Sequence, residues 1–219
     1  MSNNQLRNLI KSSPSIYPFY INWIRRLNVD FPNNSTDLHL TGFPRSANTY
    51  CRELTKEVFP ELNIVSHIHT IASIKKALKN NVTIALLLRS PLSTTSSMLM
   101  KFDYKKEDEI LYDYIKYHEF VLRNIEKIRI FSFDEIIECP LGLISYIRST
   151  FNVDISDSSI EQKLKIAERK SSDKEKTKNP LGSSRPNSQR EERKDFYRQS
   201  IISHNLYSVA NELYLKLRK

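Results

Sequence analysis

The stretch Leu38-His39-Leu40-Thr41-Gly42-Phe43-Pro44-Arg45-Ser46-Ala47-Asn48-Thr49-Tyr50 predicts a short apolar strand that turns through small residues into a helix. The first N–H groups of a helix have no partner within it, and the helix dipole places partial positive charge there, so such a turn attracts anions. Arg45 adds a planar guanidinium group that suits phosphate or sulfate oxygens, and Ser46 and Thr49 add hydroxyl donors. The stretch therefore predicts an oxyanion-binding loop. Taken alone, an ordinary strand-to-helix turn capped by Ser46 explains it about as well.

A second stretch of the same kind follows. Residues 83–88 form a continuous apolar run, which is typical of a strand buried on both faces. The run ends at Arg89-Ser90-Pro91, where the proline suits the start of a helix, and Ser97 follows eight residues after Arg89. Taken alone, an arginine in a salt bridge and a serine-rich surface helix would explain this stretch. A third apolar strand is predicted near 128–133, before a helix that begins around Pro140.

The order of residues 44–50 resembles the 5′-phosphosulfate loop of the sulfotransferases that use PAPS (3′-phosphoadenosine 5′-phosphosulfate), which has the order Pro-Lys/Arg-Ser-Gly-Thr/Asn-Thr-Trp. Ala47 replaces the family's glycine, and Tyr50 its tryptophan; an alanine favours the usual negative φ. The spacing from Arg89 to Ser97 resembles the family's 3′-phosphate motif. Because two motifs match in register, we favour the resemblance over the local explanations. It covers about residue 37 to the C-terminus.

The resemblance implies an α/β fold with three layers, a parallel sheet flanked by helices, of the kind shared by sulfotransferases and P-loop nucleotide hydrolases. It also implies roles for individual residues. Arg89 and Ser97 would hold the 3′-phosphate, and Tyr50 and Phe133 would flank the adenine, although a core position is an equally good expectation for Phe133. A late loop with Ser184 and Arg185 would close over the 3′-phosphate, with Arg190 as the alternative cation. The residues that would hold the 5′-phosphosulfate are Arg45, Ser46, Ala47, Asn48, Thr49 and Tyr50.

The catalytic residues implied by the family are a base and a cation. Sulfuryl transfer resembles phosphoryl transfer, so Arg45 would neutralise charge on the leaving phosphate while a base takes the acceptor's proton. The family has a histidine about twenty-two residues before the phosphate-binding arginine, and His67 lies at that distance from Arg89. His69, two residues on, competes for the role. We take His67 as the base and His69 as its neighbour in the acceptor site, and we expect no metal ion.

The composition fits a sulfotransferase but is also compatible with other classes of protein. The net charge of +9 and the pI near 9.4 favour an anionic partner such as PAPS, but they suit nucleic acid or an anionic membrane as well. A nucleotide kinase on a related fold would need the ending Gly-Lys-Ser/Thr, which is missing. A non-enzymatic anion- or RNA-binding protein is the other rival, although nucleic acid is not our expected partner. The expected acceptor is a small molecule or glycan with a hydroxyl or amine group. Carbohydrate is favoured because the segment 181–207 resembles that of a carbohydrate-modifying branch of the family.

The predicted organisation is one domain over 37–219, preceded by a helical segment over 1–36 that packs on the core. The aromatic and basic stretch 16–27 could alternatively lie on a membrane interface or under the acceptor site. Residues 169–195 are polar and predict a mobile loop. No run is apolar enough to span a bilayer and no leader peptide is recognisable, so we expect a cytoplasmic enzyme.

Overall fold

The computed structural model describes residues 3–24, 29–102, 106–176 and 188–218. Its centre is a sheet of four parallel strands in the order β2-β1-β3-β4. The predicted α/β architecture is therefore confirmed. The strands are β1 (Leu38–Gly42), β2 (Ile64–Ser66), β3 (Thr83–Leu88) and β4 (Arg129–Ser132).

Strand β3 is apolar throughout because both of its faces are covered. Alternate side chains point to opposite faces of a strand. Accordingly, Ile84, Leu86 and Leu88 belong to one core cluster, whereas Ala85 and Leu87 belong to the other. The two clusters make the sheet the middle of three layers, as the continuous apolar run predicts.

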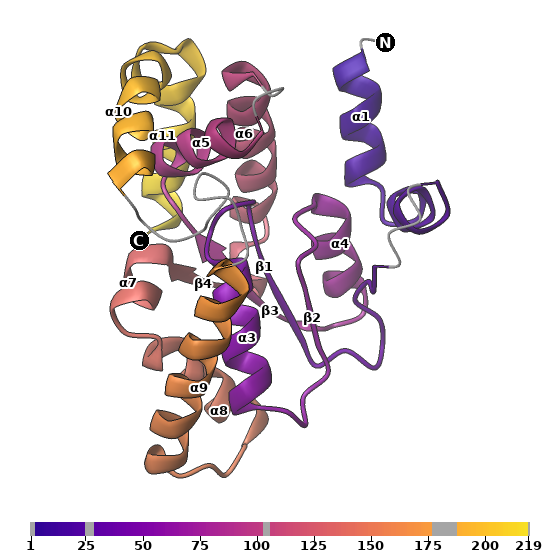
Figure 1. Ribbon diagram of the computed structural model, residues 1–219. Helices are drawn as coiled ribbons and strands as arrows, with labels where there is room; N and C mark the ends of the chain where they lie inside the picture. Colours follow the sequence, from indigo (N-terminus) through magenta and orange to yellow (C-terminus); the bar gives the residue numbers. More distant parts are fainter. Residues whose placement is uncertain (1–2, 25–28, 103–105, 177–187, 219) are drawn as a thin grey trace.

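The helices divide between these two faces (Figure 1). One cluster receives side chains from α4 (Ile71–Lys79), α5 (Pro91–Lys101), α6 (Glu107–Leu122), α10 (Ser188–Ser203) and α11 (Asn205–Leu217). The other receives them from α3 (Asn48–Val58), α7 (Phe133–Glu138), α8 (Leu141–Phe151) and α9 (Asp157–Lys176). A short 3₁₀ turn, η2 (Ile125–Lys127), leads into β4.

The N-terminal segment lies against the β2 side of the domain. It contains α1 (Asn3–Ser12), α2 (Ile16–Phe19) and a π-helical turn, η1 (Tyr20–Ile24). The Tyr17 ring meets Phe31 edge-on at 5.9 Å between centroids, and Phe31 packs on Val65 of β2. Helix α1 lies beside α4 (Figure 1), and Lys11 pairs with Asp113 of α6 at 2.9 Å. No helix in the described residues is both long and apolar enough to cross a bilayer.

The bounds predicted for the polar loop, 169–195, are wrong at both ends. Helix α9 continues to Lys176, and α10 begins at Ser188. Lysine, glutamate, arginine and glutamine are good helix formers, so a polar composition does not by itself indicate a loop. Tertiary contacts also hold α9 in place, because Lys170 pairs with Glu57 of α3. The predicted Ser184 and Arg185 lie outside the described residues, and Arg190 lies in α10.

Two fully buried histidines make the stability of the domain dependent on pH. Burial lowers the pKa of both His39 and His118 from the ordinary 6.5 to about 4. The unfolded chain therefore takes up protons below about pH 6.5 that the native chain excludes until about pH 4. Stability is fully present above the unfolded pKa and is lost as the pH falls through this window.

We expect the free energy of unfolding to fall by about 2 kcal/mol for each of these histidines between roughly pH 7.5 and pH 5. Urea unfolding at the two pH values measures the loss. In His118→Phe the free energy of unfolding should fall by about 2 kcal/mol less between these pH values than in the wild type, whatever the variant's stability at neutral pH. An equal loss in both proteins would contradict the assignment.

Candidate functional site

The candidate site lies where β1 and β3 end side by side. Gly42 is aligned with Leu87 in the parallel register, so the loop after β1 and Arg89 after β3 leave the same edge of the sheet. A Cβ atom on Gly42 would lie 2.6 Å from the Leu87 carbonyl oxygen, so only glycine allows this approach. Asn48 Nδ2 then donates to the Phe43 carbonyl at 3.1 Å and closes the loop.

The loop between β1 and α3 has a strained backbone. Arg45 and Ala47 have φ values of 73° and 62°, in the left-handed region. The expectation that Ala47 keeps a negative φ is therefore wrong. The turn requires a left-handed residue immediately before the helix. The sulfotransferases that the sequence resembles have a glycine at this position. Ala47 adopts the left-handed conformation at a steric cost that glycine does not have.

The explanation that Ser46 merely caps α3 is also wrong. Residue Ala47 occupies the N-cap position and makes no side-chain cap. The Ser46 hydroxyl is buried, with the residue 1% exposed, and has no hydrogen-bond partner among the described residues. A buried hydroxyl without a partner is costly, so its place at this helix start indicates a site built for a ligand.

The structure brings the predicted phosphate-binding residues together. Arg45 Nε donates to Ser97 Oγ at 2.9 Å, and Arg89 Nη1 donates to the Arg45 carbonyl oxygen at 2.7 Å. Ser97 lies on α5, whose N-cap is Ser90 with Pro91 as the first helical residue. These hydrogen bonds link Arg45, Arg89 and Ser97 next to the start of α3, and guanidinium groups and a helix N-terminus both favour bound anions.

Two aromatic residues contact Arg89, one at its side chain and one at its backbone. Its guanidinium lies over the Phe133 ring, 3.9 Å from the centroid. The Tyr114 hydroxyl donates to the Arg89 carbonyl oxygen at 2.8 Å. The sequence places Tyr114 on the core face of a helix, and nothing in the sequence indicates that its hydroxyl reaches the site. Phe133 contacts the site arginine and is not part of either core cluster.

The other predicted aromatic residue, Tyr50, is half-buried and packs on the core cluster under α3. Burial raises the pKa of its hydroxyl to about 12, and Glu168 of α9 contributes further. Thr49 lies one residue earlier, in the first turn of α3, and is partly exposed.

His67 and His69 follow β2 at the same edge of the sheet. His69 Nδ1 lies 2.7 Å from the Gly42 carbonyl oxygen, and as an N–H it donates to that oxygen, which leaves Nε2 as the basic atom. Burial lowers the pKa of His69 to about 4, so the ring is neutral at pH 7. His67 has a left-handed backbone with φ 68°, and its ring centroid is 6.0 Å from that of His69. Both predicted histidines therefore lie beside the loop.

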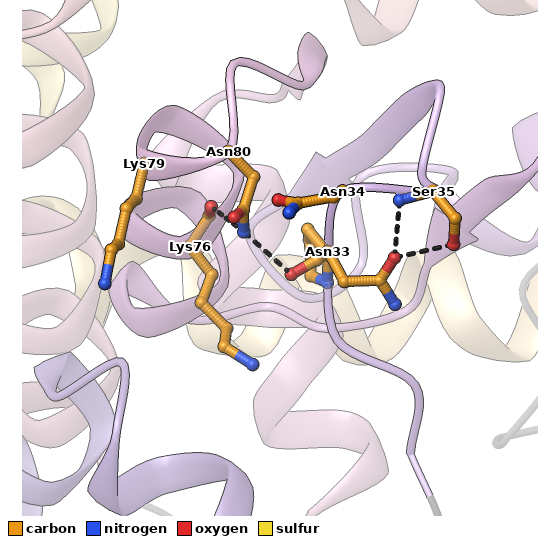
Figure 2. A pocket seen from close by; sticks show the side chains of 7 residues that line it. Asn33, Asn34, Ser35, Lys76, Lys79 and Asn80 are labelled. Atoms are coloured by element: carbon orange, nitrogen blue, oxygen red, sulfur yellow. Dashed lines mark hydrogen bonds between the residues drawn. The ribbon is translucent and has the colours of Figure 1, made fainter.

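Two surface cavities lie elsewhere. One of about 500 Å³ is bordered by the 32–35 turn and the end of α4, where Asn80 Nδ2 donates to the Lys76 carbonyl at 2.9 Å (Figure 2). This turn leads into the beginning of β1, so the cavity lies at the opposite end of the strands from the arginines. Another, of about 520 Å³, borders β2 and α3 and includes Arg52 and Lys56. Neither includes a predicted site residue.

Comparison with known proteins identifies the fold. No protein-family model and no curated protein matches the sequence. Among solved structures, the chain is similar to mouse sulfotransferase SULT7A1 complexed with PAP, with a TM-score of 0.52 and 12% sequence identity. The match covers 97% of this chain and 94% of the mouse chain. The expected sulfotransferase fold is thereby confirmed.

Replacing Ala47 with glycine tests the strained loop. Glycine adopts a left-handed φ without steric cost, so we expect Ala47→Gly to raise the free energy of unfolding by about 0.4–1 kcal/mol in urea titrations. The matched control is Ala77→Gly inside α4, which should lower stability by about 1 kcal/mol or more because helical glycine is unfavourable. Equal destabilisation by both changes would show that Ala47 is not left-handed.

Proposed function

We propose that this chain is a PAPS-dependent sulfotransferase that transfers a sulfuryl group to a hydroxyl or amine of a small molecule or glycan. The observation that carries the proposal is the hydrogen-bonded set of Arg45, Arg89 and Ser97 beside the start of α3, on a sulfotransferase fold. The two matched sequence motifs supply these three residues.

The residues present fit the donor. Its 5′-phosphosulfate would take the loop N–H groups and Arg45, and the buried Ser46 hydroxyl would gain the hydrogen bond that it lacks among the described residues. Its 3′-phosphate would take Arg89 and Ser97. A hydroxyl can accept one hydrogen bond and donate another, so Ser97 can contact the phosphate while it holds Arg45. Phe133 offers an apolar ring beside Arg89 for the adenine.

When bound, the donor supplies a sulfuryl group and leaves as 3′-phosphoadenosine 5′-phosphate. The chain's own contribution is electrostatic and positional. Arg45 is fixed by Ser97, so its positive charge is in place where negative charge grows on the leaving phosphate, without reorganisation at that moment. Backbone N–H groups at the start of α3 add to the same effect.

We assign the proton acceptor to His67 and a positioning role to His69. A base works best when its pKa lies near the working pH, and burial makes His69 a weak base at pH 7. The hydrogen bond from His69 to Gly42 instead ties the segment after β2 to the loop. Strained backbone such as that of His67 is concentrated at functional sites.

A carbohydrate acceptor is the favoured class. Its support is the resemblance of segment 181–207 to a carbohydrate-modifying branch. Within this segment, the described Phe196 is 78% exposed on α10. An exposed aromatic ring provides a stacking surface for a sugar.

The 3′-phosphate assignment can be tested by binding alone. Isothermal titration should show that the wild-type chain prefers 3′-phosphoadenosine 5′-phosphate to AMP. Arg89→Ala should weaken binding of the former by about 2–5 kcal/mol, the usual cost of removing one partner of a desolvated charge pair. AMP binding should fall less than that, because AMP loses only the support that the Arg89–Arg45 hydrogen bond gives to the loop and no phosphate contact with Arg89.

Arg129→Ala is the matched control, since Arg129 is an exposed arginine that also lies near an aromatic ring, that of Phe131. It should keep the preference for the 3′-phosphate. A folded Arg89→Ala variant with normal preference would refute the assignment. Binding of ATP with magnesium in place of both nucleotides would favour the kinase alternative.

The two histidines can be separated kinetically once a screen with labelled PAPS has found an acceptor. His67→Ala should lower kcat by about 10²–10⁴-fold, the usual contribution of a general base, while nucleotide affinity stays normal. His69→Ala should act mainly on the acceptor KM, and His69→Asn should recover part of the loss because an amide can still donate to Gly42.

The reverse pattern, with full activity in His67→Ala and a large loss of kcat in His69→Ala, would exchange the roles. Full activity in both variants would move the base to another residue without changing the donor assignment.

A further inference from the structure

Helices α1 and α2 each expose two apolar side chains. Leu6 and Leu9, three residues apart on α1, are 50% and 54% exposed, whereas Lys11 of the same helix pairs with Asp113 of α6. On α2, Ile16 and Phe19 are 48% and 55% exposed. A helix on a globular domain normally turns its apolar side toward the core. We call the four exposed side chains of Leu6, Leu9, Ile16 and Phe19 together the N-terminal apolar face.

The charge of this part of the chain has a single sign. Residues 1–29 contain the basic residues Arg7, Lys11, Arg25 and Arg26, and the first acidic residue of the chain is Asp30. Exposed apolar residues beside basic charge and aromatic rings are the combination by which a helix lies in a membrane interface, with anionic lipids adding electrostatic attraction.

A second pair of exposed apolar residues in the described structure lies near acidic residues. Ile137 and Leu141 are 54% and 45% exposed, and α7, which carries Ile137, also carries Asp134, Glu135 and Glu138. Acidic charge of this kind is repelled by an anionic surface. The N-terminal apolar face therefore belongs to a segment whose sequence is basic, whereas the second surface lies beside acidic residues.

The position of α1 suits contact with an extended surface. Figure 1 shows α1 standing at the side of the domain next to α4, with the marked N-terminus at its far end. It is joined to α6 by the Lys11–Asp113 ion pair, whereas Leu6 and Leu9 belong to neither large core cluster.

We propose that the N-terminal apolar face docks this protein on an anionic bilayer surface. The four apolar side chains would enter the boundary between headgroups and acyl chains, and the basic residues of the segment would be attracted by anionic headgroups. The inference does not depend on the proposed enzymatic function.

The test is co-sedimentation of the full chain with phosphatidylcholine vesicles that contain or lack phosphatidylserine. The wild-type chain should bind the vesicles that contain phosphatidylserine, and added salt should weaken binding. Leu6→Ser/Leu9→Ser and Ile16→Ser/Phe19→Ser should each bind about tenfold more weakly or worse, because each loses two apolar contacts. The control Ile137→Ser/Leu141→Ser should bind like the wild type.

A second measurement needs no substitution. Trp23 is the only tryptophan of the chain and follows Phe19 by four residues, so its fluorescence should be quenched by quencher-labelled lipids in vesicles that contain phosphatidylserine. Thermal unfolding checks that each variant is folded.

The proposal is overturned if the wild-type chain does not bind these vesicles, if Trp23 is not quenched, or if the control loses as much binding as the two variants. It is also overturned if sedimentation without lipid shows a wild-type dimer that Leu6→Ser/Leu9→Ser converts to a monomer, since a second copy would then cover the face.

Discussion

The hydrogen bond from Arg89 to the Arg45 carbonyl oxygen is the contact on which the site depends, because it joins two loops that leave neighbouring strands. It is charge-assisted, and such bonds are stronger and shorter than neutral ones. It also holds the backbone of Arg45 in a left-handed conformation that an arginine seldom adopts. With that backbone fixed, the Arg45 side chain reaches Ser97 on α5, so hydrogen bonds link both loops to the helix after β3.

A layer of aromatic residues beneath the loop supports this arrangement. The Phe43 ring meets Tyr114 and Tyr117 of α6 edge-on, with centroid distances of 5.3 and 5.7 Å. The His118 ring lies against Tyr114 at 3.9 Å between centroids and stays neutral because it is buried. Tyr114 in turn donates to the Arg89 carbonyl oxygen. Helix α6 thus connects the core to both arginine-bearing loops, and packing of this kind can keep strained backbone in place.

The catalytic proposal and the membrane proposal concern different parts of the molecule. The first concerns the carboxyl ends of the strands, where charge and backbone strain are concentrated. The second concerns helices that contribute little to the core and expose apolar residues. A membrane-bound enzyme could act on acceptors presented at the surface that holds it, so the two proposals are compatible, although each stands on its own observations.

The sequence alone predicted the covered parallel sheet and the residues that we assign to phosphate binding, through its apolar runs and the family resemblance of two local motifs. The apolar run at 83–88 can be buried only in the middle of a covered sheet, and the spacing of Arg89 and Ser97 follows from one strand and one helix. The left-handed Ala47, the hydroxyl of Tyr114 on Arg89 and the neutral, Gly42-bound His69 came only from the tertiary structure. The same holds for the extents of α9 and α10, where the polar composition predicted a loop. In each case the outcome depends on contacts between residues far apart in the chain: the approach of Gly42 to Leu87, the packing of α6 under the loop and the packing of α9 on α3. The local sequence around a residue does not predict such contacts, because the burial and hydrogen bonding of a residue depend on the partner that the fold places next to that residue.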